Sequence, residues 1–466
     1  MGFDFQLLEN AGIQLIDGDR GKNYPKHNDF IENGYCLFLS AKNVTKSGFQ
    51  FQETAFINET KDCELRAGKL KYGDIVLTTR GTVGNVAYYD NNNPYKHIRI
   101  NSGMIIIRAD SKIWNPKFLY FILTSIFLQK QIVNLISGSA VPQLPARDIK
   151  KLILPVISKN IQDKISNFVS ALNDKIIVNI GTNKTLEKMS QTLFKSWFVD
   201  FDPVIDNALD AGNAIPEVLQ SRADLRKKIR NSADFTPQPA NIRALFPDEF
   251  EETELGWVPK SWITTSFNDL IELIGGGTPK TSVEEYWNGN IPWFSVVDVP
   301  NESDIYVLTT EKNITTEGLK NSSAKLLRKG TTIISARGTV GKCAMVAVPM
   351  AMNQSCYGVI GKNNISDEYI YFQLKNAVQT LQQMGHGSVF NTITRDTFKN
   401  IKVPFCNEEL TNSYSLLVKN YFSKILNNNY QNIALTNLRD TLLPKLISGE
   451  LSLEDLPDII KQTEAA

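Results

Sequence analysis

The chain has 466 residues, of which 42% are hydrophobic and 21% are charged. At roughly 100–200 residues per domain, this length predicts two to four domains, and the apolar fraction excludes a disordered tail protein. Lys and Arg number 50 against 49 Asp and Glu, so the net charge of +1 excludes a global field that would attract nucleic acid or a membrane. The five cysteines form no Cys-x-x-Cys pair, which argues against a disulfide scaffold or zinc ribbon and favours a cytoplasmic protein.

The predicted elements follow the same order twice along the chain. Short apolar runs separated by Gly, Pro and Asn predict strands and turns, and each mixed region continues into a helix (116–136 or 367–384) and a short strand. A long amphipathic helix then follows in both copies. The predicted division is a mixed domain over 1–155, a long helix over 156–199, a connector with some helix over 200–255, a second mixed domain over 256–404, and a second long helix with a tail over 405–466.

The repetition is also visible in the residues themselves. Arg80-Gly81-Thr82-Val83-Gly84 follows an apolar run, and the same five residue types recur at 337–341 after a similar run. Further matches follow in the same order, and the last pairs Pro155 with Pro404. An ordered series of matches indicates two homologous units with small loop insertions.

Both long helices carry apolar residues at steps of three and four, and each spans roughly 40 residues, on the order of 60 Å. Because one small domain cannot cover such a length, we predict that they pack on each other as an antiparallel coiled coil. The alternative is that each helix covers only its own domain. Asparagines interrupt both stripes at matching places, and we interpret them as fixing the register. The stripe includes Met189, Leu417 and Leu438, and the residues predicted to pair the helices are Leu172, Ile176, Asn179, Leu186, Leu193, Tyr421, Ile425, Asn428, Leu435 and Leu442.

Fragments of catalytic motifs occur, but none is complete. Residues 338–342 resemble half of a phosphate loop, yet Ala336 and Cys343 stand where that loop needs Gly and Ser or Thr. The three histidines are scattered, which suggests neither a multi-histidine metal site nor a Ser-His-Asp triad. The sequence therefore predicts no catalytic residues, no metal site and no cofactor in this chain.

The two Arg-Gly-Thr-Val-Gly turns are better suited to binding. Glycine lets backbone N–H groups approach a phosphate closely, and an Arg fork can hold a phosphate or the O6 and N7 atoms of guanine. The alternative is a tight hairpin in which the Arg pairs with a neighbouring carboxylate.

Amides after two Gly-Ser turns, and Lys and Thr in two early loops, complete the set of candidates. An amide can read an adenine edge or cap a nearby helix or turn, and Lys can hold backbone phosphate. The candidate DNA-binding residues are Lys22, Asn23, Arg80, Thr82, Gln143, Thr278, Lys280, Arg337, Thr339, Lys342, Ser388 and Asn391.

Three long segments resemble a known family, the specificity subunits of type I restriction–modification systems. Residues 193–204 (LFKSWFVDFDPV) resemble the central conserved region of that family. Residues 255–262 (LGWVPKSW) resemble the entry to its second recognition domain, and residues 438–451 (LRDTLLPKLISGEL) resemble its C-terminal signature. The resemblance covers essentially the whole chain.

The resemblance implies an α+β fold with two tandem α/β target recognition domains, each followed by a long helix of the antiparallel pair. It implies a non-catalytic subunit that binds double-stranded DNA, recognises a bipartite target with one half-site per domain, and docks two methyltransferase subunits and restriction subunits. S-adenosylmethionine, ATP and Mg are expected in those partners. The alternative is a structural adaptor that holds two protein partners with little direct DNA readout. The first copy lacks the Gly-Gly-Gly-Thr-Pro loop of the second (275–279), as two different half-sites would require.

Overall fold

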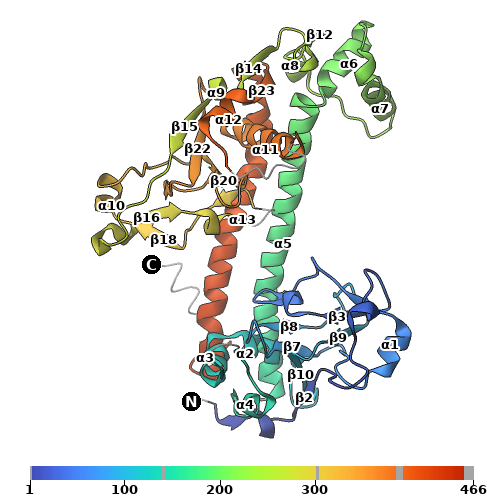
Figure 1. Ribbon diagram of the computed structural model, residues 1–466, viewed down its shortest axis with the longest axis vertical. Helices are drawn as coiled ribbons and strands as arrows, with labels where there is room; N and C mark the ends of the chain where they lie inside the picture. The colour runs from blue at the N-terminus through green and yellow to red at the C-terminus, as the bar shows by residue number, and fades with distance from the viewer. Residues whose placement is uncertain (1–2, 139–141, 301–303, 385–391, 456–466) are drawn as a thin grey trace. The chain divides into compact units, whose positions relative to one another are not determined.

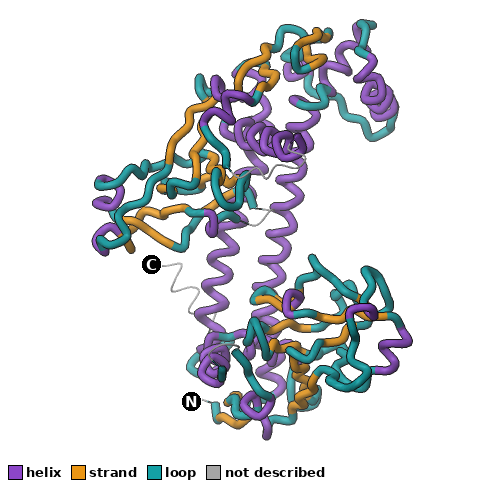
Figure 2. Tube along the Cα trace, viewed as in Figure 1, coloured by secondary structure: helices purple, strands orange, loops and turns teal. Residues whose placement is uncertain are grey.

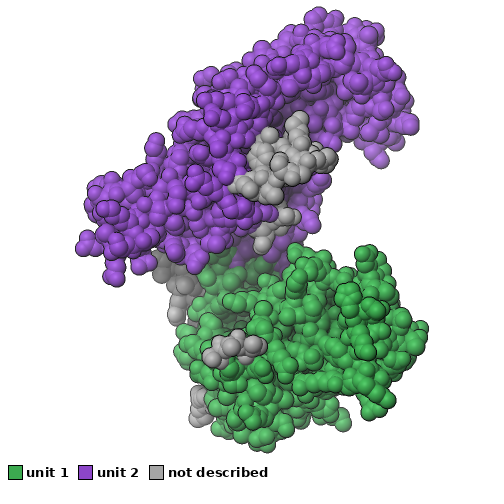
Figure 3. Space-filling model, viewed as in Figure 1, with its two compact units in different colours: residues 1–176, 433–466 green, residues 177–432 purple. Residues whose placement is uncertain are grey.

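The computed structural model describes residues 3–138, 142–300, 304–384 and 392–455 (Figure 1). The chain groups into two units, coloured separately in Figure 3. Unit 1 contains residues 1–176 and 433–466, and unit 2 contains residues 177–432. Each unit therefore combines one mixed domain with portions of both long helices.

Unit 1 is built on antiparallel strands with one parallel pair. Its four-stranded sheet has the order β2 (Ile13–Asp17), β10 (Met104–Ala109), β7 (Ile75–Thr78), β8 (Val86–Tyr88). A three-stranded sheet has the order β6 (Phe56–Ile57), β3 (Cys36–Leu39), β9 (Ile98–Ile100), in which β3 and β9 are parallel. Two ribbons pair β1 (Phe5–Leu7) with β11 (Ile153–Pro155) and β4 (Val44–Thr45) with β5 (Gly48–Phe49). The short helices are α1 (Glu59–Glu64) and α4 (Ala146–Ile149).

Unit 2 repeats the strand order of both sheets and adds one strand to the larger one. Its strands are orange in Figure 2. Its larger sheet has the order β15 (Ile271–Gly275), β22 (Cys356–Gly361), β19 (Thr332–Ser335), β20 (Cys343–Val346), β17 (Tyr306–Val307). Its smaller sheet has the order β18 (Lys312–Ile314), β16 (Trp287–Phe294), β21 (Ala351–Met352), and again the last pair is parallel. The ribbons are β14 (Ile263–Ser266) with β23 (Lys402–Phe405) and β12 (Phe250–Thr253) with β13 (Gly256–Pro259). The repeated strand order supports the duplication that the sequence indicated.

The helix predicted over 116–136 is two helices, α2 (Pro116–Thr124) and α3 (Ile126–Leu135), bent by 65°. Ser125 causes the break, because its hydroxyl donates to the carbonyl of Ile122 (2.6 Å) and accepts from the N–H of Leu128 (3.4 Å). One side chain thus ends the first helix and caps the second. In the second copy the corresponding helix, α11 (Asp367–Met384), is continuous.

No single helix of the described residues is long and apolar enough to cross a membrane. The bent pair α2 and α3 passes the test of length and composition only when its two helices are taken together. Most apolar side chains of this pair, including Phe118 and Ile122, are buried in the core of unit 1, whereas Ile126 and Val133 are exposed.

The connector contains the helices α6 (Asp202–Ala211), α7 (Gln220–Arg230) and α8 (Ala240–Arg243), as the sequence predicted in outline. Ion pairs join α6 to α7 at a constant spacing of four residues, Asp202 with Arg222, Asp206 with Arg226 and Asp210 with Arg230. The spacing matches one helical turn and shows that the two helices run parallel. The remaining short helices of unit 2 are α9 (Phe267–Leu270), α10 (Thr316–Lys320) and α12 (Arg395–Asn400).

The two long helices are α5 (Lys159–Phe198) and α13 (Glu408–Ser448). In unit 2 they lie side by side and antiparallel, because Asn179 contacts Asn432 whereas Ser190 accepts a hydrogen bond from the Tyr414 hydroxyl. In unit 1 the Arg439 guanidinium donates to the side-chain oxygen of Asn173 (2.8 Å). The antiparallel pairing predicted from the sequence is confirmed, and within each unit the helices contact one another as well as their domain.

A network of buried amides joins the two helices in unit 2. Asn179 donates to Gln431 (2.8 Å) and to Asn432 (2.9 Å). Asn183 is fully buried; it donates to Asn429 (2.6 Å) and accepts from Asn428 (2.8 Å). Each amide has only a few partners, and these lie at fixed positions along the helix axis. A shift of one helix along the other would therefore leave buried amides unpaired.

The apolar stripe of the sequence is only partly buried. All ten residues predicted to pair the helices are buried or half-buried, whereas Met189, Leu417 and Leu438 are exposed. The apolar stripe of the sequence is therefore wider than the face that the two helices bury. The ends of the helices are buried instead by their own unit.

Each unit has a core that uses the C-terminal end of one long helix. In unit 2, Trp197 and Phe198 at the end of α5 pack on Tyr414 and Tyr369, with a Phe198–Tyr369 ring distance of 4.9 Å. In unit 1, Leu442 and other apolar residues at the end of α13 join the core formed by the N-terminal domain. The C-terminal part of the chain therefore belongs structurally with the N-terminal domain.

The amide network gives a testable prediction for stability. Asn183→Ala removes one donor and one acceptor and leaves Asn428 and Asn429 with unpaired amide groups, so it is expected to lower the free energy of unfolding by about 1–3 kcal/mol. Differential scanning calorimetry of the whole chain measures this as a lower midpoint for the transition of unit 2. Lys184→Ala, a change at the exposed neighbouring position, is the control and is expected to leave the midpoint unchanged. Equal midpoints for the two variants would contradict a stabilising role for the network.

Candidate nucleic-acid interface

One end of the larger sheet gathers the candidate binding loops in each unit. In unit 1, Asp17 at the end of β2 pairs with Ile105, and Thr78 at the end of β7 pairs with Met104 at the start of β10. In unit 2, Gly275 and Ser335 occupy the same places beside Tyr357 and Cys356. Since neighbouring strands are antiparallel, the loops after β2 and β7 and before β10 and β8 converge at one edge, and so do their counterparts. We call this end of the larger sheet, with its loops, the reading edge of unit 1, and the corresponding end in unit 2 the reading edge of unit 2.

The Arg-Gly-Thr-Val-Gly loop of unit 1 is closed by Thr78. Its hydroxyl donates to the carbonyl of Thr82 and accepts from the N–H of Asn85 (3.0 Å). Gly81 and Gly84 have φ values of +75° and +95°, which favour glycine. Among the described residues, no heavy atom lies within 4 Å of the place where a Cβ of Gly81 would stand, so the tip of the loop faces open space there.

The loop of unit 2 has the same construction with Ser335 in place of Thr78. The Ser335 hydroxyl donates to the carbonyl of Thr339 and accepts from the N–H of Lys342 (2.9 Å). Gly338 and Gly341 have φ values of +78° and +86°. Two sequences in separate units therefore give one loop geometry, which positions Arg80 and Arg337 alike.

Both guanidinium groups are exposed and have no ion-pair or hydrogen-bond partner within the described ranges. The alternative of a hairpin in which Arg80 or Arg337 pairs with a neighbouring carboxylate is therefore wrong for both copies. The following residues, Thr82 and Thr339, are also exposed. An unpaired guanidinium beside a glycine-rich turn is free to donate to an incoming anion.

A third segment adds to each edge. Gln143 forms an antiparallel bridge with Arg80, and Thr392 forms the corresponding bridge with Arg337. The backbone contacts match, because Leu144 donates to the carbonyl of Thr79 and Ile393 donates to that of Ala336. Gln143 is exposed, as the sequence hypothesis requires. Ser388 and Asn391 lie outside the described residues.

The early loops contribute unequally. Lys22 and Lys280 are exposed, and the backbone N–H of the exposed Lys342 belongs to the loop closure described above. The Asn23 amide donates to the carbonyl of Glu64 (3.2 Å), so it holds the fold of unit 1. Thr278 donates to the side-chain oxygen of Gln354.

The sequence reasoning missed the turn before β10 and β22. Asn101 accepts from the N–H of Gly103 (2.9 Å), and Asn353 accepts from that of Ser355 (3.0 Å). A Cβ at Gly18 or Gly276 would clash with the backbone of Asn101 or Asn353 respectively. The signal lay in Gly18 and Gly276, which follow equivalent strands; the turn itself is visible only from long-range packing.

A hollow of about 640 Å³ lies beside the glycine loop of unit 1. Gly81, Thr82 and Asn85 line one side, and Thr45, Lys46 and Ser47 line the other. Lys46 thus places a cation in the same hollow as the glycine loop, which favours an anionic ligand at this edge.

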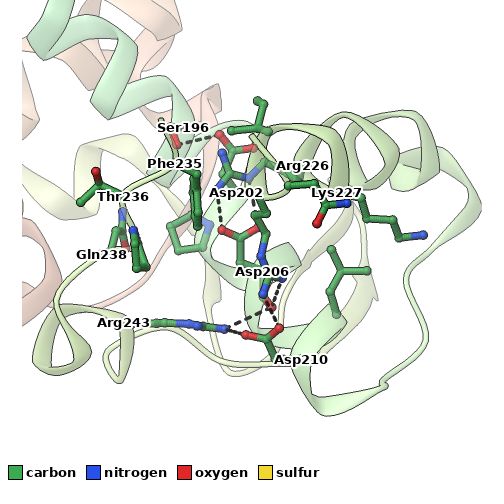
Figure 4. Close-up of a pocket in the computed structure, with 16 residues that line it drawn as sticks. Ser196, Asp202, Asp206, Asp210, Arg226, Lys227, Phe235, Thr236, Gln238 and Arg243 are labelled. Carbon is green, nitrogen blue, oxygen red and sulfur yellow. Dashed lines mark hydrogen bonds and ion pairs between the residues drawn. The ribbon is translucent and has the colours of Figure 1, made fainter. Parts of the chain in front are cut away.

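The cavity in the connector has a different character (Figure 4). It has a volume of about 730 Å³, and its carboxylates Asp206 and Asp210 face Arg226 and Arg243. Two arginines, Arg230 and Arg243, lower the pKa of Asp210 by hydrogen bonding. The side-chain oxygen of Gln238 is buried there without a hydrogen-bond partner. Within the described residues every charged side chain that lines the cavity is ion-paired, so none of them is left over for a ligand.

The described residues contain no group of three or more His, Cys, Asp or Glu that could hold a metal ion. All five cysteines are free, and only Cys63 is exposed. Burial raises the thiol pKa to about 12 at the other four, Cys36, Cys343, Cys356 and Cys406. These four thiols stay protonated at neutral pH and are poor nucleophiles.

Comparison with known proteins identifies the family. The family described as "Type I restriction modification DNA specificity domain" matches residues 11–188 and 259–437, which together make up most of the chain. The chain belongs to this family. It is a type I restriction–modification specificity subunit with two specificity domains, and it is a non-catalytic component.

Named relatives agree with the family assignment. The chain is 28% identical to the type I restriction enzyme HindI specificity subunit of Haemophilus influenzae, over 93% of this chain and 98% of that one. It is 32% identical to the MjaIX specificity subunit of Methanocaldococcus jannaschii, over 40% of this chain and 44% of that one. The crystal structure of the type I restriction–modification S subunit from M. genitalium has the same fold, with a TM-score of 0.52 at 15% identity and coverage of 96% of both chains.

The loop geometry predicts that two substitutions in the same loop change the stability of this specificity subunit by different amounts. Gly84→Ala forces a Cβ onto a residue with φ of +95° and to within 3.3 Å of Ile132, so it is expected to destabilise unit 1 by about 1–3 kcal/mol. Arg80→Ala is expected to change stability by less than about 0.5 kcal/mol, because the guanidinium has no partner. Chemical denaturation followed by circular dichroism compares the two. A large loss for Arg80→Ala would show that its side chain supports the fold.

Proposed function

We propose that this specificity subunit binds double-stranded DNA directly with its two reading edges and recognises a bipartite target, one half-site at each edge. The single observation that carries the proposal is the pair of unpartnered guanidinium groups, Arg80 and Arg337, on two loops of the same geometry. Two edges of one construction in one chain fit a target that has two parts.

The chemistry of each edge suits a phosphate backbone. The glycines expose backbone at the loop tip, the Arg donates in a fork, and the exposed Thr hydroxyl is a further donor. These contacts bring local positive charge to the DNA although the chain as a whole has a net charge of only +1. Affinity should therefore depend on salt through a few defined residues and not through a general positive surface.

We further propose that the chain assembles with two methyltransferase subunits and with restriction subunits. Catalysis, together with S-adenosylmethionine, ATP and Mg, would belong to those partners, and the complex would act in the cytoplasm. The portion of the helix pair in unit 2 supports docking. Its seam contains amides, whereas apolar Val178 and Met189 on α5 are 59% and 46% exposed. Eleven residues correspond to slightly more than three turns, so both lie on one side of the helix.

A hollow of about 680 Å³ lies on α5 at Met189, and Val178 is not among the residues that line it. Met189 and Leu193 line it together with Tyr421 of α13, and Lys184 and Lys188 stand at its rim. An apolar groove along two helices suits an amphipathic helix of a partner, with acidic residues facing the two lysines. We assign this groove to a methyltransferase subunit.

The alternative function is a structural adaptor that holds two protein partners while only they contact DNA. The groove on α5 would serve an adaptor equally well. The unpaired arginines favour direct DNA binding, because an adaptor gives them no ligand.

The salt dependence of DNA binding tests the proposal. In the complex with methyltransferase subunits, Arg80→Ala and Arg337→Ala are each expected to weaken binding and to reduce the slope of log affinity against log salt by about 1, since each removes one phosphate contact. Fluorescence anisotropy with target and non-target duplexes measures both quantities. The loss should be the same on both duplexes.

The matched control is Lys112→Ala, an exposed cation beyond the opposite end of β10. It is expected to leave the slope unchanged. If both arginine variants bind as the unaltered complex does, at every salt concentration, the adaptor function is correct and direct DNA binding through these edges is wrong.

The docking surface has its own test. Val178→Ser combined with Met189→Ser is expected to leave the fold intact and to reduce co-purification of the methyltransferase subunit at least tenfold, because both side chains are solvent-exposed in the chain alone. Val218→Ser, at a connector residue that is 74% exposed, is the control. Undiminished co-purification of the double variant would place the methyltransferase elsewhere.

A further inference from the structure

The two reading edges differ in a restricted way. Four features of backbone geometry are shared, namely the glycine loop, the Asn-anchored turn before β10 and β22, the close approach of Gly18 or Gly276 to that turn, and the bridge to a third segment. Arg, Gly, Thr and Val of the glycine loop are the same in both. A residue that is identical at both edges contributes the same contact to each, so it cannot distinguish two different half-sites.

Discrimination must therefore come from positions where the backbone is shared and the side chains differ. The tip of the Asn-anchored turn is such a position, with Ser102 in unit 1 and Gln354 in unit 2. Met104 and Cys356 donate to the Asn carbonyls at the same distance, 3.3 Å, and the N–H of Thr79 or Ala336 donates to the carbonyl after the tip at 2.8 Å in both units. The two tip residues thus start from the same place at the edge.

Gln354 is also oriented before any ligand arrives. Its side chain is exposed, and its oxygen accepts a hydrogen bond from the Thr278 hydroxyl. One lone pair of that oxygen and both N–H groups remain available, because the amide has four hydrogen-bonding positions. Fixing the amide in this way lowers the entropy that it would lose on binding.

At a second differing position, the residue of unit 1 is excluded by its contacts. Asn85 in unit 1 corresponds to Lys342 in unit 2, but the Asn85 amide donates to the carbonyl of Val44 (2.9 Å) and holds the fold. Gln143 and Thr392 also differ and are exposed, but no hydrogen bond orients their side chains among the described residues. Gln354 is exposed, and its side chain is held by a hydrogen bond from the side chain of Thr278.

Building on the proposed function, we propose that Gln354 is a specificity-determining residue that reads an A·T base pair in the half-site of unit 2, and that Ser102 is its counterpart at the other edge. A glutamine amide can donate to N7 and accept from N6 of adenine in the major groove. Ser102 has a single short hydroxyl, which contacts any of several bases and gives a weaker preference. The two edges thereby share the protein backbone geometry that contacts DNA and differ in the base that they select. Thr278 is a positioning residue that acts through Gln354.

The test uses the full chain assembled with its methyltransferase subunits, with adenine methylation mapped over a library of randomised duplexes. Gln354→Glu keeps the size and the hydrogen bond from Thr278 but removes both donors, so it is expected to lower methylation of the original target roughly ten- to hundredfold. The requirement for A·T at one pair of one half-site should be relaxed. Thr278→Val should relax the same pair more weakly, and Ser102→Ala should affect only the other half-site.

The outcomes separate this inference from the proposed function. If Gln354→Glu and Gln354→Ala methylate the unchanged set of targets, at whatever rate, Gln354 does not read a base and the inference is wrong, although direct DNA binding can still hold. If the arginine variants leave the salt slope unchanged as well, the proposed function fails too. Circular dichroism and co-purification of the partner check each variant; Thr278→Val decides the matter should Gln354→Glu not fold.

Discussion

The architecture depends on how two forty-residue helices bury their sides. An isolated helix of this length cannot stay in water with an uncovered apolar stripe, and a single small domain covers only a few of its turns. The chain covers the side of each long helix in different ways at its ends and in its middle. Near the ends the stripe packs into the core of a domain, as Trp197 and Leu442 do, whereas the middle is joined by the amides around Asn183.

The amide network makes the contact between the two long helices less stable than an apolar contact would be, but it specifies how the helices pair. Leucines tolerate sliding by a turn, whereas the hydrogen bonds of Asn179 and Asn183 exist at one register only. Within unit 2 the network therefore fixes the register of α5 against α13.

Much of the fold was predictable because the sequence contains an internal repeat. The repeated Arg-Gly-Thr-Val-Gly run located both glycine loops, and periodicity located both long helices. The helix over 116–136 was wrongly taken as continuous, since the capping role of Ser125 depends on its hydroxyl reaching Ile122 and Leu128. Asn101 and Gln354 were missed for a different reason, because their positions become meaningful only when distant strands meet. The local pattern of residues predicts helices and strands, whereas the candidate site is formed by contacts between elements that are far apart in the chain.

The distribution of cores along the chain has a consequence for biosynthesis. Unit 2 is one continuous stretch, from residue 177 to 432, so every residue of its core is available once that stretch has left the ribosome. The core of unit 1 includes Leu442, Leu446 and Ile447, which are translated after the whole of unit 2. The N-terminal domain is therefore completed after unit 2, and the nascent chain carries its unfinished apolar face until these residues have left the ribosome.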